Sequence, residues 1–381
     1  MPFRDVIGHV RVLELLARST GQGTLPPSLI FSGPSGVGKM LTATAVAQAL
    51  NCLQPRVTAG GKEPSKEAGG GAAGAPSAVR RDGVAAARPE GLGVGPQVVS
   101  KDACGVCAAC TRIARRVHPD IVIVEPRETG SVKDTGAIKI DQVRDIVDRA
   151  AYRPFEGKKR VVIIDQADAL VGAAQNALLK TLEEPPSCSV FILITARPGV
   201  LLPTVRSRCP QLRFRPLATR DVIAALIARG QSERDARIIA ATADGSLGRA
   251  LESGAGDFAE AREVARNVLT QVAGRADAGR RIGAAKELLT NTGAGGAGDR
   301  EQLASHLRAM ASLVRDVEVL ATNADAGTLA NPDLKPALET LVPAFRGERG
   351  VQAFSAIDRA LAALERNSGV KVVADWLVLQ L

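Results

Sequence analysis

A glycine-rich segment near the N-terminus has the residue types and spacing of a phosphate-binding loop (P-loop). Its residues are, in order, Gly33, Pro34, Ser35, Gly36, Val37, Gly38, Lys39 and Met40. Glycines let backbone N–H groups curve around a phosphate, and the lysine ammonium reaches the terminal phosphates of a nucleotide. A short apolar run precedes the loop and an alanine-rich stretch follows it, as strand and helix should. We therefore predict a nucleotide site here.

Two positions of this predicted site lack the side chains that hydrolysis requires. Met40 stands where a hydroxyl would hold Mg²⁺, and a thioether is a poor ligand for a hard cation. Asp165 ends a later apolar run and is placed to orient Mg²⁺, but it is followed by Gln166 instead of a carboxylate. An amide cannot accept a proton from the attacking water. We expect ATP hydrolysis to be weak or absent, which leaves open whether ATP and Mg²⁺ bind and whether the chain is an enzyme.

Three cysteines at i, i+3 and i+6 indicate a metal site. Cys104, Cys107 and Cys110 supply three thiolates, and a closed structural zinc site requires four ligands. Cys52 is the natural fourth, because closing the longer loop costs only ~1.6 kcal/mol while structural zinc contributes ~10 kcal/mol or more. His118 as the fourth ligand, or four free thiols, are the alternatives.

These candidate residues sit on a predicted α/β arrangement. Short apolar runs alternate with segments of helical period, which favours a parallel sheet with helices on both faces. After residue 216 the apolar runs stop and only helical patterns follow. Predicted strands cover residues 28–32, 121–125, 161–165 and 190–195. Predicted helices cover residues 10–20, 39–52, 141–151, 173–184, 219–229, 232–243, 258–272, 281–289, 301–321, 332–341, 352–366 and 370–381.

Composition indicates an insertion and limits the kinds of partner and site that the chain can have. About half of residues 53–103 are Gly, Ala or Pro, so we expect a disordered insertion there. The net charge of +9 suits a polyanionic partner, but the ten aromatic residues are too few for a base-stacking platform. Three scattered histidines give no hydrolase constellation. No apolar run reaches membrane-spanning length and no secretory signal is seen, so we expect a cytoplasmic protein without membrane contact.

Several further motifs resemble one family. Residues 176–186 read NALLKTLEEPP and residues 202–209 read LPTVRSRC, which together resemble the clamp-loader branch of the AAA+ ATPases. The cysteine spacing is similar to the zinc module of its bacterial members. Residues 3–9, 118–120 and 138–144 resemble the delta-prime family of DNA polymerase III subunits more than the gamma/tau family. The resemblance covers about residues 1–250.

The resemblance implies roles for three residues. Arg208 would be an arginine finger that reaches the ATP site of a neighbouring subunit, with a solvated basic turn as the alternative. Arg249 would contact phosphate from a lid, and Thr195 would occupy the first-sensor position at the end of its strand. The alternative for Arg249 is a solvated arginine, and the alternative for Thr195 is a purely structural role. The nucleotide-binding set is then Gly33, Gly36, Val37, Gly38, Lys39, Met40, Asp165, Thr195 and Arg249.

The expected organisation is an AAA+ P-loop core at 1–216 with a zinc module at 52–110, a helical lid at 217–257 and an all-α collar at 258–381. The resemblance implies a hydrolysis-defective subunit of a hetero-pentamer with gamma/tau and delta, acting on the sliding clamp and primer-template DNA. An active gamma/tau-type ATPase is the main alternative, although the end at residue 381 leaves no room for a long polymerase-binding tail. A zinc-dependent DNA-binding module with a relic P-loop is another.

Overall fold

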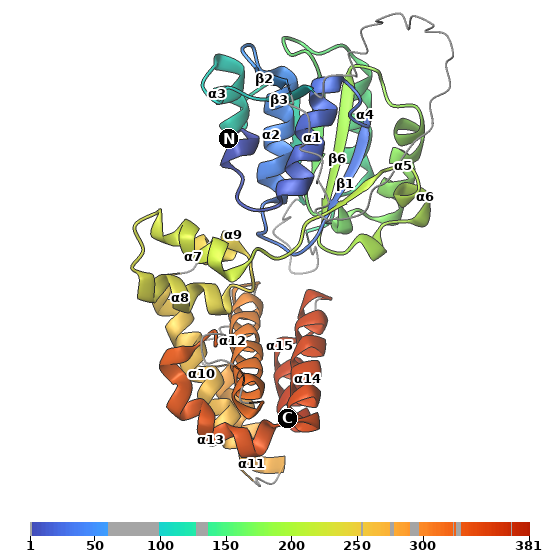
Figure 1. The fold of residues 1–381 in the computed structure, drawn as a ribbon. Coiled ribbons are helices and arrows are strands. Elements are labelled where there is room, and N and C mark those ends of the chain that lie inside the picture. The colour runs from blue at the N-terminus through green and yellow to red at the C-terminus, as the bar shows by residue number, and fades with distance from the viewer. Residues whose placement is uncertain are drawn as a thin grey trace, which may run out of the picture.

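The computed structural model describes most of the chain as an α/β core followed by helices (Figure 1). The described residues are 2–59, 99–126, 136–252, 254–274, 278–289, 297–322, 324, 329–366 and 368–381. Residues 60–98, most of the predicted insertion, lie outside them. Its two ends do not match the predicted disorder, because strands β2 (Arg56–Ala59) and β3 (Val99–Asp102) pair antiparallel. The composition of the whole segment concealed these two short strands.

Five parallel strands form the central sheet in the order β4-β5-β6-β1-β7. The strands are β1 (Ser28–Ser32), β4 (Ile121–Val124), β5 (Arg160–Ile164), β6 (Ser189–Thr195) and β7 (Gln211–Arg213). The four predicted strands are confirmed within one residue at each end. Strand β7 was not predicted, because three residues with two exposed side chains carry no apolar run.

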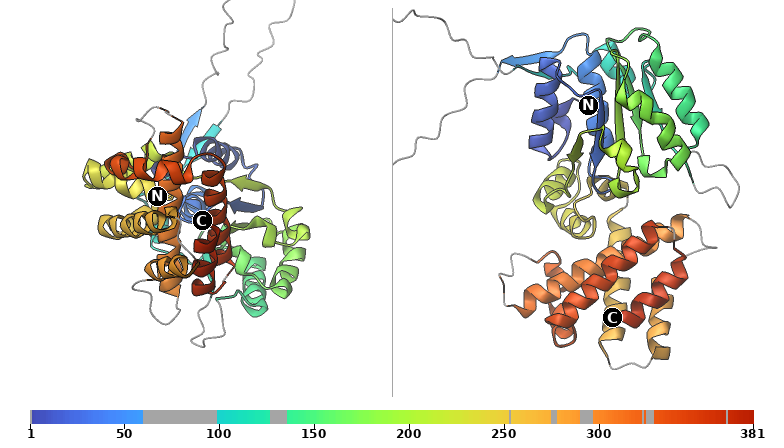
Figure 2. Two further views of the ribbon diagram at one scale, coloured as in Figure 1. Left: turned by 90° about the horizontal axis from the view of Figure 1, so that it is seen from below. Right: turned by 90° about the vertical axis from the view of Figure 1, so that its right-hand side faces the viewer.

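Helices cover both faces of this sheet because its strands are apolar on both sides. Leu29 and Phe31 of β1 pack with helices α1 (Val10–Gln22) and α2 (Lys39–Asn51). Ile30, between them, faces the opposite layer. That layer contains α4 (Ile140–Ala151), α5 (Gly172–Glu183) and α6 (Pro203–Arg206). Figure 2 shows the sheet between these two layers.

The rest of the described chain is helical and has two further cores. Helices α7 (Thr219–Ile227), α8 (Glu233–Thr242) and α9 (Leu247–Glu252), here called the lid, share one core. The larger core joins α10 (Ala255–Ala273), α11 (Ala278–Leu288), α12 (Ala297–Ala321), α13 (Lys335–Phe345), α14 (Glu348–Glu365) and α15 (Val370–Gln380). No helix among the described residues is long and apolar enough to cross a membrane.

Candidate functional site

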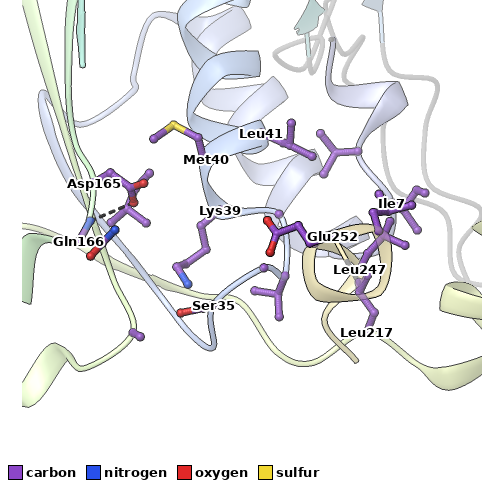
Figure 3. Close-up of a pocket in the computed structure, with 18 of the residues that line it drawn as sticks. Ile7, Ser35, Lys39, Met40, Leu41, Asp165, Gln166, Leu217, Leu247 and Glu252 are labelled. Atoms are coloured by element: carbon purple, nitrogen blue, oxygen red, sulfur yellow. Dashed lines mark hydrogen bonds between the residues drawn. The ribbon is translucent and has the colours of Figure 1, made fainter. Parts of the chain in front are cut away.

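The P-loop borders a cavity of about 550 Å³ between the α/β core and the lid (Figure 3). The loop follows β1 and ends at the first turn of α2, so backbone N–H groups of a helix N-terminus face this space. Gly33, Gly36 and Gly38 all have positive φ, which allows the tight turn. Of the predicted nucleotide set, the cavity is lined by Gly36, Val37, Gly38, Lys39, Met40, Asp165 and Thr195.

The ammonium group of Lys39 lies across the loop. Its Nζ donates to the carbonyl oxygens of Gly33 and Pro34, each at 2.5 Å. Burial lowers the pKa of Lys39 to about 8, against the opposing attraction of Asp165 and Asp168. A bound phosphate would stabilise the charged form and compete for the same N–H groups.

Asp165 and Gln166, which the sequence places after a core strand, both line the cavity. Figure 3 shows Asp165 and Gln166 on one side of Lys39 and Glu252 of α9 on the other. Burial raises the pKa of Asp165. Its Oδ1 accepts the backbone N–H of Gln166 at 2.9 Å. Met40 lines the same cavity and is partly packed into the core, so a thioether stands where the sequence motif would have a hydroxyl.

The strand-end threonine is already hydrogen-bonded inside the chain. The hydroxyl of Thr195 donates to Asp168 Oδ1 at 2.9 Å, and Asp168 is also paired with Arg197 at 2.7 Å. Thr195 therefore lines the cavity while its hydroxyl fixes Asp168. The sequence pattern indicated the position of Thr195 but not this bond, because Asp168 lies on a separate turn.

The lid rests directly on the P-loop. The backbone N–H of Gly248 donates to the carbonyl of Gly36 at 2.8 Å. A Cβ atom added at Gly36 would lie 2.1 Å from Ser246 Oγ, and one at Gly248 would lie 2.8 Å from Gly36 Cα. Side chains at these two positions would separate the lid from the loop.

The predicted lid arginine does not line this cavity. Arg249 Nη2 donates to the carbonyl of Ala243 at 2.9 Å, and Arg249 borders a separate cavity beside α10 and α12. The lid residues that line the nucleotide cavity include Arg229, at the end of α7, and Glu252. Sequence reasoning missed both, because neither lies in a motif.

Arg208 lies at an exposed edge of the core, just after α6. Its side chain is 32% exposed, and its Nε donates to Glu183 Oε1 at 2.7 Å. Cys209, the next residue, is buried in the core on the α5–α6 side, and burial raises its pKa to about 11. The buried cysteine anchors the backbone while the guanidinium stays at the surface.

The four predicted metal ligands come together. The sulfur atoms of Cys52, Cys104, Cys107 and Cys110 all lie within 4.8 Å of one another. Two of the separations are 3.9 and 4.0 Å. These are close to the ~3.8 Å between sulfurs of a tetrahedral zinc site with bonds of about 2.3 Å. Burial raises the pKa of Cys52, so its thiolate requires a compensating cation, whereas despite burial backbone hydrogen bonds lower the pKa of Cys107 to about 6.

His118 is not part of this cluster. Its Nδ1 accepts the backbone N–H of Asp120 at 3.2 Å, and its Nε2 lies 3.4 Å from Glu156. Among the described residues, the four cysteines alone form the potential metal-binding group, which removes the histidine alternative. The donor set fits a closed structural zinc site.

Side chains from distant segments fix the cysteine-bearing backbone. Arg4 Nη2 donates to the carbonyl of Cys104 at 2.9 Å, and Gln48 Nε2 donates to that of Cys110 at 2.7 Å. The cysteine cluster also joins α2 to α3 (Ala108–Ala114), which begins directly after Cys107. These contacts connect the cluster to the N-terminal segment and to the helix that begins at the P-loop.

Comparison with known proteins agrees with these motifs. The family model "DNA polymerase III, delta subunit" matches residues 94–218. DNA polymerase III subunit delta' of Bacillus subtilis is 30% identical over 253 residues, or 66% of this chain and 61% of that protein. Subunit delta' of Pseudomonas aeruginosa is 43% identical over 109 residues, 29% of this chain and 32% of the relative.

Subunits of DNA polymerase III that are named gamma/tau also match this chain. DNA polymerase III subunit gamma/tau of Mycobacterium tuberculosis is 32% identical over 229 residues, which is 60% of this chain. The match spans only 31% of that relative's length.

Proposed function

Because this chain belongs to the clamp-loader family of DNA polymerase III subunits that includes delta-prime, we propose that it acts as a delta-prime-like subunit. In this role it takes part in the ATP-dependent loading of a sliding clamp onto primed DNA. One observation carries the proposal: a P-loop that lacks its catalytic side chains occurs in the same core as an exposed Arg208.

The proposed catalytic contribution is made to a neighbouring subunit. A guanidinium can donate to two phosphate oxygens at once and neutralise charge that develops on the γ-phosphate. Arginine fingers of this type raise the hydrolysis rate by about 10³–10⁵-fold in measured systems. Arg208 is exposed at an edge of the core, where a second protein can approach it.

The chain's own cavity would bind nucleotide with little or no hydrolysis. Lys39 and the loop glycines would supply the phosphate contacts, and Asp165, one of the acidic residues that line the cavity, would orient Mg²⁺. Met40 and Gln166 leave the metal and the attacking water without their usual partners. The four cysteines would hold a structural Zn²⁺ that stabilises the fold of the core.

The proposed organisation follows the three cores. Residues 1–216 form the AAA+ core, residues 217–257 the lid, and residues 258–381 a collar that assembles with gamma/tau and delta subunits in a hetero-pentamer. Contacts with the clamp and primer-template DNA would then be made by the complex, in the cytoplasm.

An active gamma/tau-type ATPase is the second candidate, favoured by the 32% identity to gamma/tau over 229 residues. Turnover by the purified chain separates the two, because sustained hydrolysis would support the motor role. Tight, salt-sensitive binding of duplex DNA by the chain alone would instead support a separate DNA-binding module.

Reconstitution tests the proposed function directly. The loader is assembled from its other subunits with and without this chain, and clamp loading and ATP turnover are measured together. We expect both to fall when the chain is left out. Unchanged clamp loading without the chain would refute the proposal.

A further inference from the structure

One edge of the Arg208 guanidinium is occupied by Glu183. Both Nε and Nη2 of Arg208 contact the same oxygen, Glu183 Oε1, with the Nε–Oε1 distance at 2.7 Å. Nη1, on the other side of the group, donates to the carbonyl of Thr204 at 2.7 Å. The guanidinium is therefore held from two directions.

The two holding groups are themselves fixed in the fold. Glu183 is the last residue of α5, and Leu182 before it is buried in the core. Thr204 lies in α6, where Val205 is fully buried. Glu183 and Arg208 are 25 positions apart in the sequence, and their contact joins the ends of two elements anchored in the same layer.

An arginine finger needs such support because its side chain is long. A free arginine side chain samples many rotamers, and ordering it at the moment of reaction opposes catalysis. A guanidinium that is already oriented loses less freedom when it meets a phosphate. The Arg208 side chain is 32% exposed, so packing leaves part of it free and a polar partner adds to its order.

We propose that Glu183 is a positioning residue that holds Arg208 in the orientation needed to reach the neighbouring subunit's γ-phosphate. The inference rests on the finger role proposed above for Arg208. Glu183 uses the Nε side and one carboxylate oxygen, while Nη1 and Nη2 also carry N–H bonds that point away from that oxygen. The carboxylate is 48% exposed, so the pair is too weak to prevent Arg208 from engaging phosphate.

The test compares variants in the reconstituted loader. Glu183→Ala should lower kcat for ATP about fivefold, which is the scale of an exposed charged pair, with KM for ATP unchanged. Glu183→Gln keeps the accepting oxygen without its charge and should retain intermediate turnover. Glu184→Ala, at the adjacent exposed glutamate, is the matched control and should leave kcat unchanged.

A second measurement reads the position of the side chain directly. The ¹⁵Nε–H signal of Arg208 in the full chain, assigned by its loss in Arg208→Lys, should exchange slowly with water. Exchange should accelerate in Glu183→Ala and remain slow in Glu184→Ala. A purely structural role for Glu183 would instead lower the melting temperature or disturb assembly without changing this signal selectively.

The outcomes separate the two proposals. If Arg208→Ala abolishes turnover and Glu183→Ala leaves kcat and the Nε–H signal unchanged, the finger stands and the positioning role is refuted. A rise in kcat on Glu183→Ala would mean that the carboxylate competes with phosphate, which also refutes it. If neither variant affects turnover, the finger role fails and the positioning role falls with it.

Discussion

The nucleotide cavity and the Arg208 edge belong to the same α/β core but differ in what they offer to a nucleotide. The cavity has the shape for a nucleotide, with a turned glycine loop, a helix N-terminus and a lid, but it lacks two reactive side chains. The Arg208 edge offers a guanidinium that, in the proposed role, acts only when a second protein binds there. Under this proposal the binding shape and the reactive group lie in different parts of the same fold.

Removing the finger gives the largest expected change. Arg208→Ala should lower ATP turnover at the neighbouring site of the reconstituted loader by about 10³-fold, because the charge that develops on phosphate loses its partner. Steady-state hydrolysis and size-exclusion chromatography are measured together. Arg206→Ala, two residues away and exposed, is the control. Unchanged turnover in Arg208→Ala would refute the proposed finger role of Arg208.

Removing the metal should affect both regions through the fold they share. Elemental analysis is expected to find one zinc per chain, and Cys110→Ser should lower Tm by about 10 °C, because structural zinc contributes several kcal/mol to folding. Cys188→Ser is the control, since this thiol lies outside the cluster. A metal-free chain with the native Tm would contradict the zinc assignment.

Substitutions that restore the missing hydroxyl and carboxylate should increase ATP binding and hydrolysis at the nucleotide cavity. Met40→Thr restores a hydroxyl next to Lys39 and should tighten Mg²⁺-dependent ATP binding about tenfold. Adding Gln166→Glu supplies a carboxylate for the attacking water, so the double variant should gain turnover in the loader. Met40→Leu serves as the control for size. If both variants bind ATP as the native chain does, other features of the cavity limit binding.

A smaller effect on nucleotide affinity is expected from the pKa of Lys39. Below about pH 8 the ammonium is charged in the free cavity, and above it the neutral amine must gain a proton when phosphate binds. Nucleotide affinity should therefore fall roughly eightfold between pH 7.5 and 9. Titration with a fluorescent nucleotide measures this, and Lys39→Arg should flatten the profile because arginine stays charged. A flat native profile would show that Lys39 does not contact phosphate.

The sequence predicted the sheet and the cysteine cluster well, for physical reasons. Buried parallel strands need continuous apolar runs, and thiolate ligands need cysteines, so both leave marks in the sequence. Strand β7 and the β2–β3 pair left no such mark, because these strands are short and carry no continuous apolar run.

Long-range polar contacts were the hardest to anticipate. The motifs identified Arg208 and Thr195, but their partners Glu183 and Asp168 come from other turns of the fold. Arg249 was expected at the nucleotide, but its Nη2 donates to the carbonyl of Ala243 and the residue lines the cavity beside α10 and α12. Side-chain direction in a short helix depends on tertiary packing, which residue spacing alone does not encode.

The contact between Gly36 and Gly248 changes how the glycines of the P-loop segment are interpreted. These two residues must lack side chains for the lid to close on the loop, whether or not ATP is ever cleaved. Part of the glycine content of this loop therefore serves the packing of the lid and says nothing about catalysis. Under the proposal, the residues at positions 40 and 166 decide activity.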